Sequence, residues 1–324
     1  MSRPFVSVVI PTHDRTALLR AALDSVARQT FRDFEAIVVD DGSTEDVAAA
    51  VTDHPARPRI VRQERRGPAA ARNRGVAEAS AETVAFLDSD DAWLPDKLSR
   101  FLAAAREAAE VPIWYGPMRP VDSAGREVPG RTKDCRAGRI TPWLFESSFV
   151  HVPTVVCRRS LLEEFGGFDE QLPVCEDYDL WLRLSAVHEF GLVPEPLALR
   201  GLHPGRLSKS CMARNLAVKA AVLERFYARY GGDGLLDPAA ARRRLARVLL
   251  AAARAALRER FFARAVDLAR RAESYGASRL RARAKILLAR LLSWADRDRA
   301  GDRKPAPFAA ANWPRQGLPL PRGR

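Results

Sequence analysis

An α/β domain followed by a run of helices is predicted from two patterns in the sequence. In the first 110 residues, short apolar runs alternate with segments of helical periodicity. After residue 215, helical patterns follow one another without a strand-like segment between them. The composition, 47% hydrophobic and 29% charged over 324 residues, is that of a globular protein with one large domain or two smaller ones.

The first elements can be justified in chain order. Strands are expected where apolar runs end in turn residues, over 5–11, 34–43, 59–63 and 83–88. Helices are expected between and after them, over 16–29, 45–51, 68–79 and 94–108. In the first helix, Leu19, Leu23 and Val26 recur at helical spacing, and Pro95 stands near the start of the last. This alternation predicts a sheet built of parallel crossovers.

The rest of the chain divides into an irregular part and a helical part. Short strand-like pieces are expected over 113–116, 149–157, 190–195 and 197–203, with a helix over 175–187. Longer helices are expected over 215–230, 238–260, 261–276 and 278–295. We therefore predict a first domain over 1–212, a helical region over 213–298, and a disordered Pro- and Arg-rich tail over 299–324.

The charge and the cysteines narrow the class of protein. A net charge of +13 indicates an anionic partner. Nucleic acid is not expected, because the arginines are not interleaved with stacking aromatic residues and no nucleic-acid module is recognisable. No apolar stretch reaches the roughly 18 residues of a membrane span, and the N-terminus does not resemble a secretory signal. The four cysteines form no C-x-x-C pair, which favours reduced thiols in a cytosolic chain.

Polar residues follow three of the predicted strands, as "PTHD", "DDGS" and "DSDD". The carboxyl ends of parallel strands meet at one edge of a sheet, where ligands bind. There Asp88, Asp90 and Asp91 can present carboxylates to a divalent cation. Taken alone, an Asp-x-Asp is more often solvated or capping: Asp88 or Ser89 can cap a following helix, and Asp91 stays open between the two interpretations. Similarly, Arg72 either meets an anion or lies on a basic helix surface.

The order of these motifs resembles the family 2 glycosyltransferases. "PTHDR", "VDDGS", "GPAAARN" and "DSDD" are followed by "CEDYDLWLRL" (175–184) and "LHPGRLSKS" (202–210), so that the resemblance spans about residues 5 to 210. It implies a GT-A fold, a Rossmann-like nucleotide-binding sheet to which a C-terminal all-helical extension is here attached. It also implies transfer of sugar from a nucleotide-diphosphate sugar with inversion at the anomeric carbon.

The resemblance also implies roles for particular residues. The first strand-end loop, with Pro11, Thr12 and Asp14, would wrap the nucleotide. Asp41 would accept a hydrogen bond from uracil or thymine, and Arg72 would approach the diphosphate. The remaining expected contacts are Asp88 and Ser89 for the donor, Asp90 and His203 for Mn²⁺ or Mg²⁺, and Asp177 as catalytic base. Two positions depart from the family pattern: Asp14 replaces a common Asn, and His13 replaces a frequent aromatic residue.

These residue types suit a direct displacement. A divalent cation and an arginine stabilise a departing diphosphate, and a carboxylate accepts the proton of the attacking hydroxyl. From its position alone, the pair Glu176 and Asp177 also fits a helix N-terminus without any catalytic role. The missing Q-x-x-R-W segment argues against a processive synthase.

The expected function is therefore metal-dependent transfer of a sugar from a UDP- or dTDP-sugar to a saccharide or lipid-linked acceptor, in polysaccharide or glycoconjugate biosynthesis. We expect such an enzyme to be cytoplasmic, either free or attached at the inner face of the plasma membrane. One alternative is a nucleotidyltransferase, although "PTHDR" is not the Gly-rich loop that such enzymes carry after their first strand. Another is an inactive, membrane-binding scaffold of the same fold.

The basic helical region leaves two interpretations open. In the segment 240–295, arginines at 243, 247, 254 and 258 alternate with apolar residues at 245, 248, 249 and 252. This is an amphipathic helix with one cationic side. It either belongs to a helical hairpin that packs against the catalytic domain and leaves the arginines in water, which is the commoner arrangement, or it contacts anionic lipid.

Overall fold

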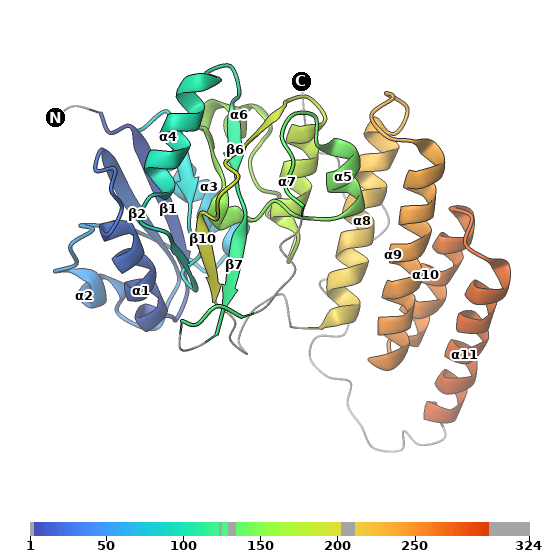
Figure 1. Ribbon diagram of the computed structural model, residues 1–324. Helices are drawn as coiled ribbons and strands as arrows, with labels where there is room; N and C mark the ends of the chain where they lie inside the picture. Colours follow the sequence, from blue (N-terminus) through green and yellow to red (C-terminus); the bar gives the residue numbers. More distant parts are fainter. Residues whose placement is uncertain (1–2, 123–124, 129–133, 202–210, 298–324) are drawn as a thin grey trace. The chain divides into compact units, whose positions relative to one another are not determined.

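The computed structural model describes residues 3–122, 125–128, 134–201 and 211–297. Its residues fall into two compact units (Figure 1). Among the described residues, one unit holds 3–171 and 176–201, and the other holds 172–175 and 211–297. The predicted boundary at residue 212 and the predicted tail over 299–324 remain predictions, and the tail lies outside the described residues.

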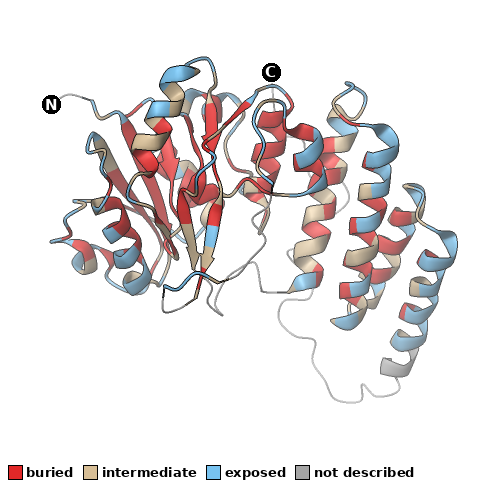
Figure 2. Cartoon of the chain, viewed as in Figure 1, coloured by how far each residue is buried: buried red, intermediate tan, exposed pale blue. Residues whose placement is uncertain are grey.

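The first unit is built on a seven-stranded mixed sheet in the order β3-β2-β1-β4-β8-β6-β9. The first four strands in this order are mutually parallel, and β8 runs antiparallel to both of its neighbours. The strands are β1 Val6–Thr12, β2 Phe34–Asp41, β3 Arg59–Gln63, β4 Thr83–Phe86, β6 Ile113–Tyr115, β8 Val156–Arg158 and β9 Phe190–Leu192. Every residue of β1 is buried, as expected of a parallel strand covered on both faces (Figure 2).

Helices and a smaller sheet complete this unit. The helices are α1 Thr16–Ala27, α2 Val47–Val51, α3 Pro68–Glu78, α4 Lys97–Glu107, α5 Thr141–Glu146, α6 Arg159–Glu164 and α7 Glu176–Ser185, with a short 3₁₀ turn η1 at Val152–Thr154. The smaller sheet has the order β5-β10-β7, formed by Asp91–Trp93, Ala198–Gly201 and Met118–Val121. Leu19 and Leu23 of α1 share a core cluster with Val8 of β1.

The sequence predicted many of these elements, but it missed β7, α5 and α6 and misjudged other places. The strand expected over 149–157 is reduced to β8, preceded by η1, because Pro153 has no N–H to donate to a ladder. The helix expected from residue 94 begins only at Lys97. Strand β5 begins at Asp91, the last residue of the "DSDD" segment, and was not predicted.

Helix α3 approaches the sheet unusually closely, and a glycine allows it. A Cβ placed on Gly75 would lie 2.2 Å from Cγ1 of Val9 in β1, so that no other residue fits without a shift of the backbone. The helix begins after Gly67, whose φ of 93° lies in the region that favours glycine. The sequence of α3 thereby fixes the position of Arg72, which lies between these two glycines.

Lys97 at the start of α4 is a fully buried cation. Its ammonium group donates to the carbonyl of Pro153 at 2.9 Å and lies 3.6 Å from the ring centroid of Trp93. Burial lowers the pKa of Lys97 well below its usual range. The carbonyl of Pro153 also accepts from Nε1 of Trp93 at 2.8 Å, and would therefore keep a partner without the lysine.

We expect Lys97→Met to stabilise the protein at pH 7 by about 1 kcal/mol or more, or roughly 2–4 °C in Tm, because no charge is then buried. Unfolded Lys97 keeps its proton up to its ordinary pKa of 10.5, whereas folded Lys97 loses it at lower pH. The stability of the unmodified protein therefore rises toward pH 10.5, and the advantage of the variant shrinks. Melting curves between pH 6 and 10.5 measure this. Arg106→Met, at an exposed site of the same helix, should change little.

In its described residues, the second unit contains four helices, α8 Met212–Tyr230, α9 Pro238–Arg258, α10 Phe262–Ser274 and α11 Arg279–Arg297. Helix α9 packs against α8 and α10, and α11 packs mainly against α10. The apolar face of α9, with Leu245, Val248, Leu249 and Ala252, is buried in this unit, and its arginines at 243, 247, 254 and 258 are exposed. The apolar face of α9 is therefore covered within this unit, and its arginines form a solvated face, whereas packing against the catalytic domain remains a prediction. No helix in the described part of the chain is both long and apolar enough to cross a membrane.

Candidate active site

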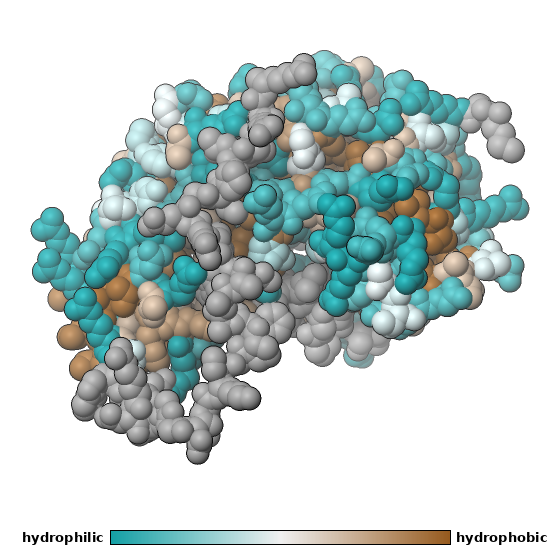
Figure 3. Space-filling model, turned by 180° about the vertical axis from the view of Figure 1, so that it is seen from behind, coloured by the Kyte–Doolittle hydropathy of each residue, from teal (hydrophilic) through white to brown (hydrophobic). Residues whose placement is uncertain are grey.

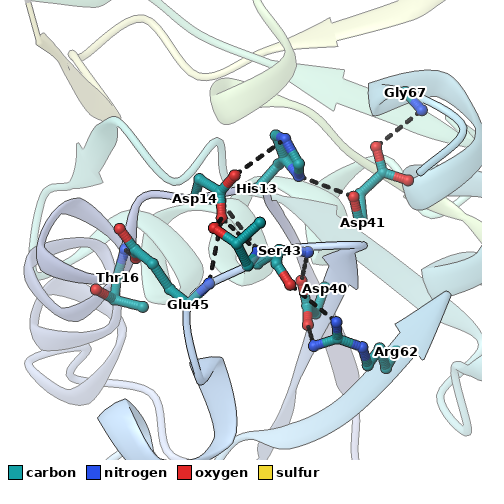
Figure 4. A network of polar contacts seen from close by, with 10 residues as sticks. His13, Asp14, Thr16, Asp40, Asp41, Ser43, Glu45, Arg62 and Gly67 are labelled. Atoms are coloured by element: carbon teal, nitrogen blue, oxygen red, sulfur yellow. Dashed lines mark hydrogen bonds and ion pairs between the residues drawn. The ribbon is translucent and has the colours of Figure 1, made fainter. Parts of the chain in front are cut away.

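The loops that follow β1 and β2 are tied together by Asp14. Its Oδ1 accepts hydrogen bonds from N of Thr44 at 2.6 Å and from Oγ1 of Thr44 at 3.0 Å, and its own N–H donates to Oγ of Ser43 (Figure 4). These bonds, led by the backbone N–H of Thr44, hold the pKa of Asp14 below its usual range. His13 contacts the same loop through Nδ1, 2.9 Å from the carbonyl oxygen of Asp41. The two strand ends thus meet, as the sequence predicted.

Asp41 at the end of β2 organises a third loop, the one that leads into α3. Its Oδ1 accepts from Nε2 of Gln63 and from N of Arg66, each at 2.8 Å, and its Oδ2 accepts from N of Gly67 at 2.8 Å. The carboxylate is buried, and it places the backbone before α3 beside the end of β2. Figure 4 shows the Asp41 side chain directed toward Gly67.

Arg72 is the central cation of the site. It is buried in α3 and donates from Nη1 to Oε1 of Glu176 and from Nη2 to Oδ1 of Asp88, each at 2.7 Å. Burial alone would lower the pKa of Arg72, but the two carboxylates outweigh it and raise that pKa above its usual value. The guanidinium also lies 5.4 Å from the ring centroid of Phe168. A single side chain therefore links the end of β4 to the first turn of α7.

Removing this bridge should destabilise the first unit. Arg72→Met leaves Glu176 buried and Asp88 half-buried without their cation, which we expect to cost about 3–5 kcal/mol of unfolding free energy. Arg74→Met on the same helix removes an exposed ion pair with Glu78 and should cost less than about 1 kcal/mol. Urea unfolding of both variants measures the difference. Equal midpoints for the two would contradict a buried bridge.

The acidic residues after β4 form a compact cluster. One carboxylate oxygen from each of Asp88, Asp90 and Asp91 lies within 4.8 Å of the others. Oδ1 of Asp91 accepts from N of Gly201 in β10 at 3.0 Å, and Nη1 of Arg15 lies 3.4 Å from Oδ2 of Asp90. The alternative that Asp88 or Ser89 caps a following helix is wrong, because strand β5 follows. The helix-cap interpretation of Asp91 is wrong for the same reason.

This cluster fits a divalent cation. Hard cations such as Mg²⁺ and Mn²⁺ prefer carboxylate oxygens, and three carboxylates this close repel one another unless a positive charge lies between or beside them. Arg72 and Arg15 each approach one member of the cluster from the protein side. The three carboxylates are the kind of ligand found in an oxygen-ligated metal site, and Asp88, Asp90 and Asp91 are the candidate ligands.

Asp177 lies in the first turn of α7, next to Glu176. Burial, followed by the repulsion of Glu176, raises the pKa of Asp177 to about 7, although Arg72 opposes the shift. Its Oδ1 accepts from N of Tyr178 at 2.7 Å. A carboxylate with such a pKa can both accept and release a proton near neutral pH. The same helix carries Asp179, which is engaged in a buried pair with Arg183.

Two buried polar atoms at this edge have no hydrogen-bond partner among the described residues. They are Oγ1 of Thr12, at the end of β1, and Nε of Arg72. Pro11 and Ser89 are buried beside these strand ends. His203, the other expected metal ligand, lies outside the described residues. Buried polar atoms normally have partners, so Thr12 and Arg72 are two exceptions at this edge.

Two partners in the site could not be found from the sequence. Glu176 binds Arg72 across 104 positions of the chain, and Arg15 reaches Asp90 across 75. No local pattern marks either pair. Glu176 was recognisable only as an acid at a helix start, and Arg15 only as part of the first loop.

Comparisons with known proteins give the class and then the family. The chain is similar in structure to Staphylococcus aureus TarS, residues 1–349, in complex with UDP-GlcNAc, with a TM-score of 0.66, 21% identity, and coverage of 91% of this chain and 92% of that one. It is also similar to a mannosyltransferase of Pyrobaculum calidifontis in complex with GDP-Man and Mn²⁺, with a TM-score of 0.54, 20% identity, and coverage of 93% and 83%. The fold is a mixed α/β sheet of the GT-A type followed by C-terminal helices.

Sequence comparisons agree. Residues 7–166 match the model of Glycosyl transferase family 2, and the chain belongs to that family. An uncharacterised glycosyltransferase of Rickettsia felis is 29% identical over 195 residues, covering 60% of this chain and 32% of that protein. The Myxococcus xanthus O-antigen biosynthesis protein RfbC is 32% identical over 203 residues, covering 60% and 16%. The chain thus spans about a third or less of the length of these two relatives.

Proposed function

We propose that this chain is an inverting, metal-assisted glycosyltransferase that moves a sugar from a UDP- or dTDP-sugar to a saccharide or lipid-linked acceptor. The observation that carries the proposal is the bridge through Arg72. It holds Asp88, a member of the acidic cluster, and Glu176, next to Asp177, on either side of one guanidinium. A displacement needs a group that stabilises the leaving group and a group that deprotonates the nucleophile. The acidic cluster, with a bound cation, would serve the first need, and Asp177 would serve the second.

On the leaving-group side, the donor would occupy the edge formed by the first three strand-end loops. The hydroxyl of Thr12 and Nε of Arg72 are buried at this edge without a hydrogen-bond partner among the described residues, and phosphate or ribose oxygens of the donor would supply partners for them. Asp90, with Asp88 and Asp91, would hold Mn²⁺ or Mg²⁺, which when bound supplies positive charge for the diphosphate. The Mn²⁺ and GDP-Man of the Pyrobaculum enzyme and the UDP-GlcNAc of TarS support a donor of this class.

The contacts between the loops support further proposed roles. Asp14 and Ser43 join the first two loops, and Pro11 and Thr12 would there contact the nucleotide. Asp41 receives three hydrogen bonds from the loop before α3, and a uracil or thymine base would add to or replace one of these donors. Ser89, between Asp88 and Asp90, would meet the donor sugar or ribose, and His203 would complete the metal or diphosphate contacts.

On the nucleophile side, Asp177 would act as the base. The acceptor oxygen forms a bond to the anomeric carbon while the bond from that carbon to the diphosphate oxygen breaks. The nucleoside diphosphate leaves with the bonding electron pair, and the acceptor proton passes to Asp177. The pKa near 7 suits this transfer at neutral pH. The name of RfbC supports polysaccharide assembly as the pathway.

The first test is binding of nucleoside diphosphates by calorimetry, with UDP, dTDP, GDP and ADP, each with Mn²⁺ and with EDTA. We expect UDP or dTDP to bind in Mn²⁺, and the affinity to fall at least about tenfold in EDTA, because the diphosphate then loses its counter-charge. Tighter binding of GDP or ADP would contradict the proposal that the nucleobase of the donor is uracil or thymine. Lack of binding by all four would overturn the donor site and favour the inactive scaffold.

A further inference from the structure

Helix α11 carries an apolar face that the rest of its unit leaves uncovered. Its leucine stripe consists of Leu280, Leu287, Leu288, Leu291 and Leu292, with exposed fractions between 39% and 80%. Ala282 and Ala289, on the opposite side of the helix, are fully buried. The helix therefore packs on its neighbours through small residues and presents its large apolar residues outward. Figure 2 shows the exposed residues along this outermost helix of the unit.

The spacing makes the stripe continuous. Leu280, Ala284, Leu287 and Leu291 follow one another at intervals of four, three and four residues, which places them in one row of an α-helix. Leu288 and Leu292 lie next to this row. Helix α9 is equally amphipathic by sequence, but its apolar residues are buried. The leucine stripe resembles the apolar face of α9 in composition, but it is exposed to solvent. Figure 3 shows that hydrophobic residues reach the surface of the molecule.

The stripe is flanked by positive charge on both sides. At 100° per residue, Arg279, Arg283 and Arg290 lie along one border and Lys285 lies along the other. Arg281 projects between the directions of Leu288 and Leu292, at the N-terminal end of the helix. Residues 279–293 contain no Asp or Glu. Burial, together with Arg254 of α9 and Arg281, lowers the pKa of Lys285, so that a second helix adds to the positive field.

The positive charges beside the leucine stripe favour one kind of binding partner over another. A second copy of the chain, related by a twofold axis, would bring the same five cations into opposition, which costs affinity. An anionic lipid surface satisfies both features at once, because leucines enter the acyl boundary while flanking Arg and Lys meet the headgroups. We propose that the outward face of α11 is a docking surface for anionic phospholipid membranes, with the leucine stripe inserted and its arginine borders on the headgroups.

This proposal does not depend on the donor or acceptor of the enzyme. It also differs from the surface that the sequence offered, since α9 contributes only exposed arginines such as Arg254. A docked α11 would hold the enzyme at the membrane surface, where lipid-linked substrates are found.

The test is sedimentation of the full chain with vesicles of phosphatidylcholine alone or with one-third phosphatidylglycerol. We expect binding to the phosphatidylglycerol vesicles only, weakened by 0.5 M NaCl. Leu287→Ser with Leu291→Ser should reduce affinity about tenfold or more. Arg283→Gln with Arg290→Gln should reduce it about 25-fold, at roughly fivefold per charge near the surface. Leu18→Ser with Val187→Ser, at exposed apolar sites of the other unit, is the matched control and should change nothing.

Several results would overturn the proposal. Equal binding to both kinds of vesicle would exclude the role of charge, and binding unchanged in the α11 variants would exclude the stripe. Light scattering gives the third readout. A dimer that dissociates in the Leu287→Ser, Leu291→Ser variant would assign the stripe to a second copy. A monomer that binds neither kind of vesicle would mean that another part of the chain covers the leucine stripe. Unchanged melting temperatures of the variants establish that they are folded.

Discussion

Asp177→Asn is expected to reduce sugar transfer by about 10²–10⁴-fold while donor binding stays nearly intact. The amide keeps the size of the side chain and can still accept from the N–H of Tyr178, but it cannot take a proton from the acceptor. Turnover is measured as nucleoside diphosphate released with acceptor present, and donor affinity by calorimetry. Glu163→Gln, an exposed carboxylate of the same unit, is the control and should keep full activity.

The pH dependence gives the same prediction a second readout. The proposed base, Asp177, can accept a proton only when it is unprotonated, and its pKa is raised to about 7. The turnover of the unmodified enzyme should therefore rise with pH through about 7 and level off above it. The residual activity of Asp177→Asn should lack this rise. Full activity in the Asn variant, with the rise retained, would mean that another group is the base.

Asp90→Ala should give the second large effect, a loss of Mn²⁺-dependent turnover of roughly 10²–10³-fold. Asp90 is the candidate ligand that closes the acidic cluster on the side of Arg15, and without it the cation that stabilises the departing diphosphate is held weakly. Turnover titrated with Mn²⁺ measures the change. Asp33→Ala removes an exposed carboxylate and should leave the titration unaltered. Identical Mn²⁺ dependence in Asp90→Ala and the unmodified enzyme would place the metal elsewhere.

Elements set by local pattern could be predicted from the sequence. Strands β1 to β4 and the helices between them follow from the alternation of apolar runs with segments of helical spacing. The apolar run of β1 and the leucines of α1 are examples. Strand β5 could not be predicted in this way. Asp91–Trp93 has no strand-like pattern of its own, and becomes a strand by pairing with β10, where Arg200 faces Asp91.

The site was predictable to a similar degree. That the loops after β1, β2 and β4 share one edge follows from parallel strands, and their contacts bear this out. The partners of Arg72 depend on tertiary packing, since Gly75 lets α3 approach the sheet and α7 arrives from a distant part of the chain. Likewise, α9 and α11 have similar sequence patterns, and only the fold decides which apolar face is covered.

The central claim is that this edge binds a nucleotide sugar and releases a nucleoside diphosphate. The most direct measurement is product identification after incubation of the full chain with UDP- and dTDP-sugars and Mn²⁺, beside Asp177→Asn and Asp90→Ala. We predict the nucleoside diphosphate as product, its release lost in EDTA and reduced in both variants. A parallel incubation supplies the nucleoside triphosphate and a sugar 1-phosphate in place of the nucleotide sugar. Pyrophosphate release there, with no nucleoside diphosphate released from the nucleotide sugars, would show a nucleotidyltransferase and contradict the claim. Nucleoside diphosphate release that both variants retain would also contradict it.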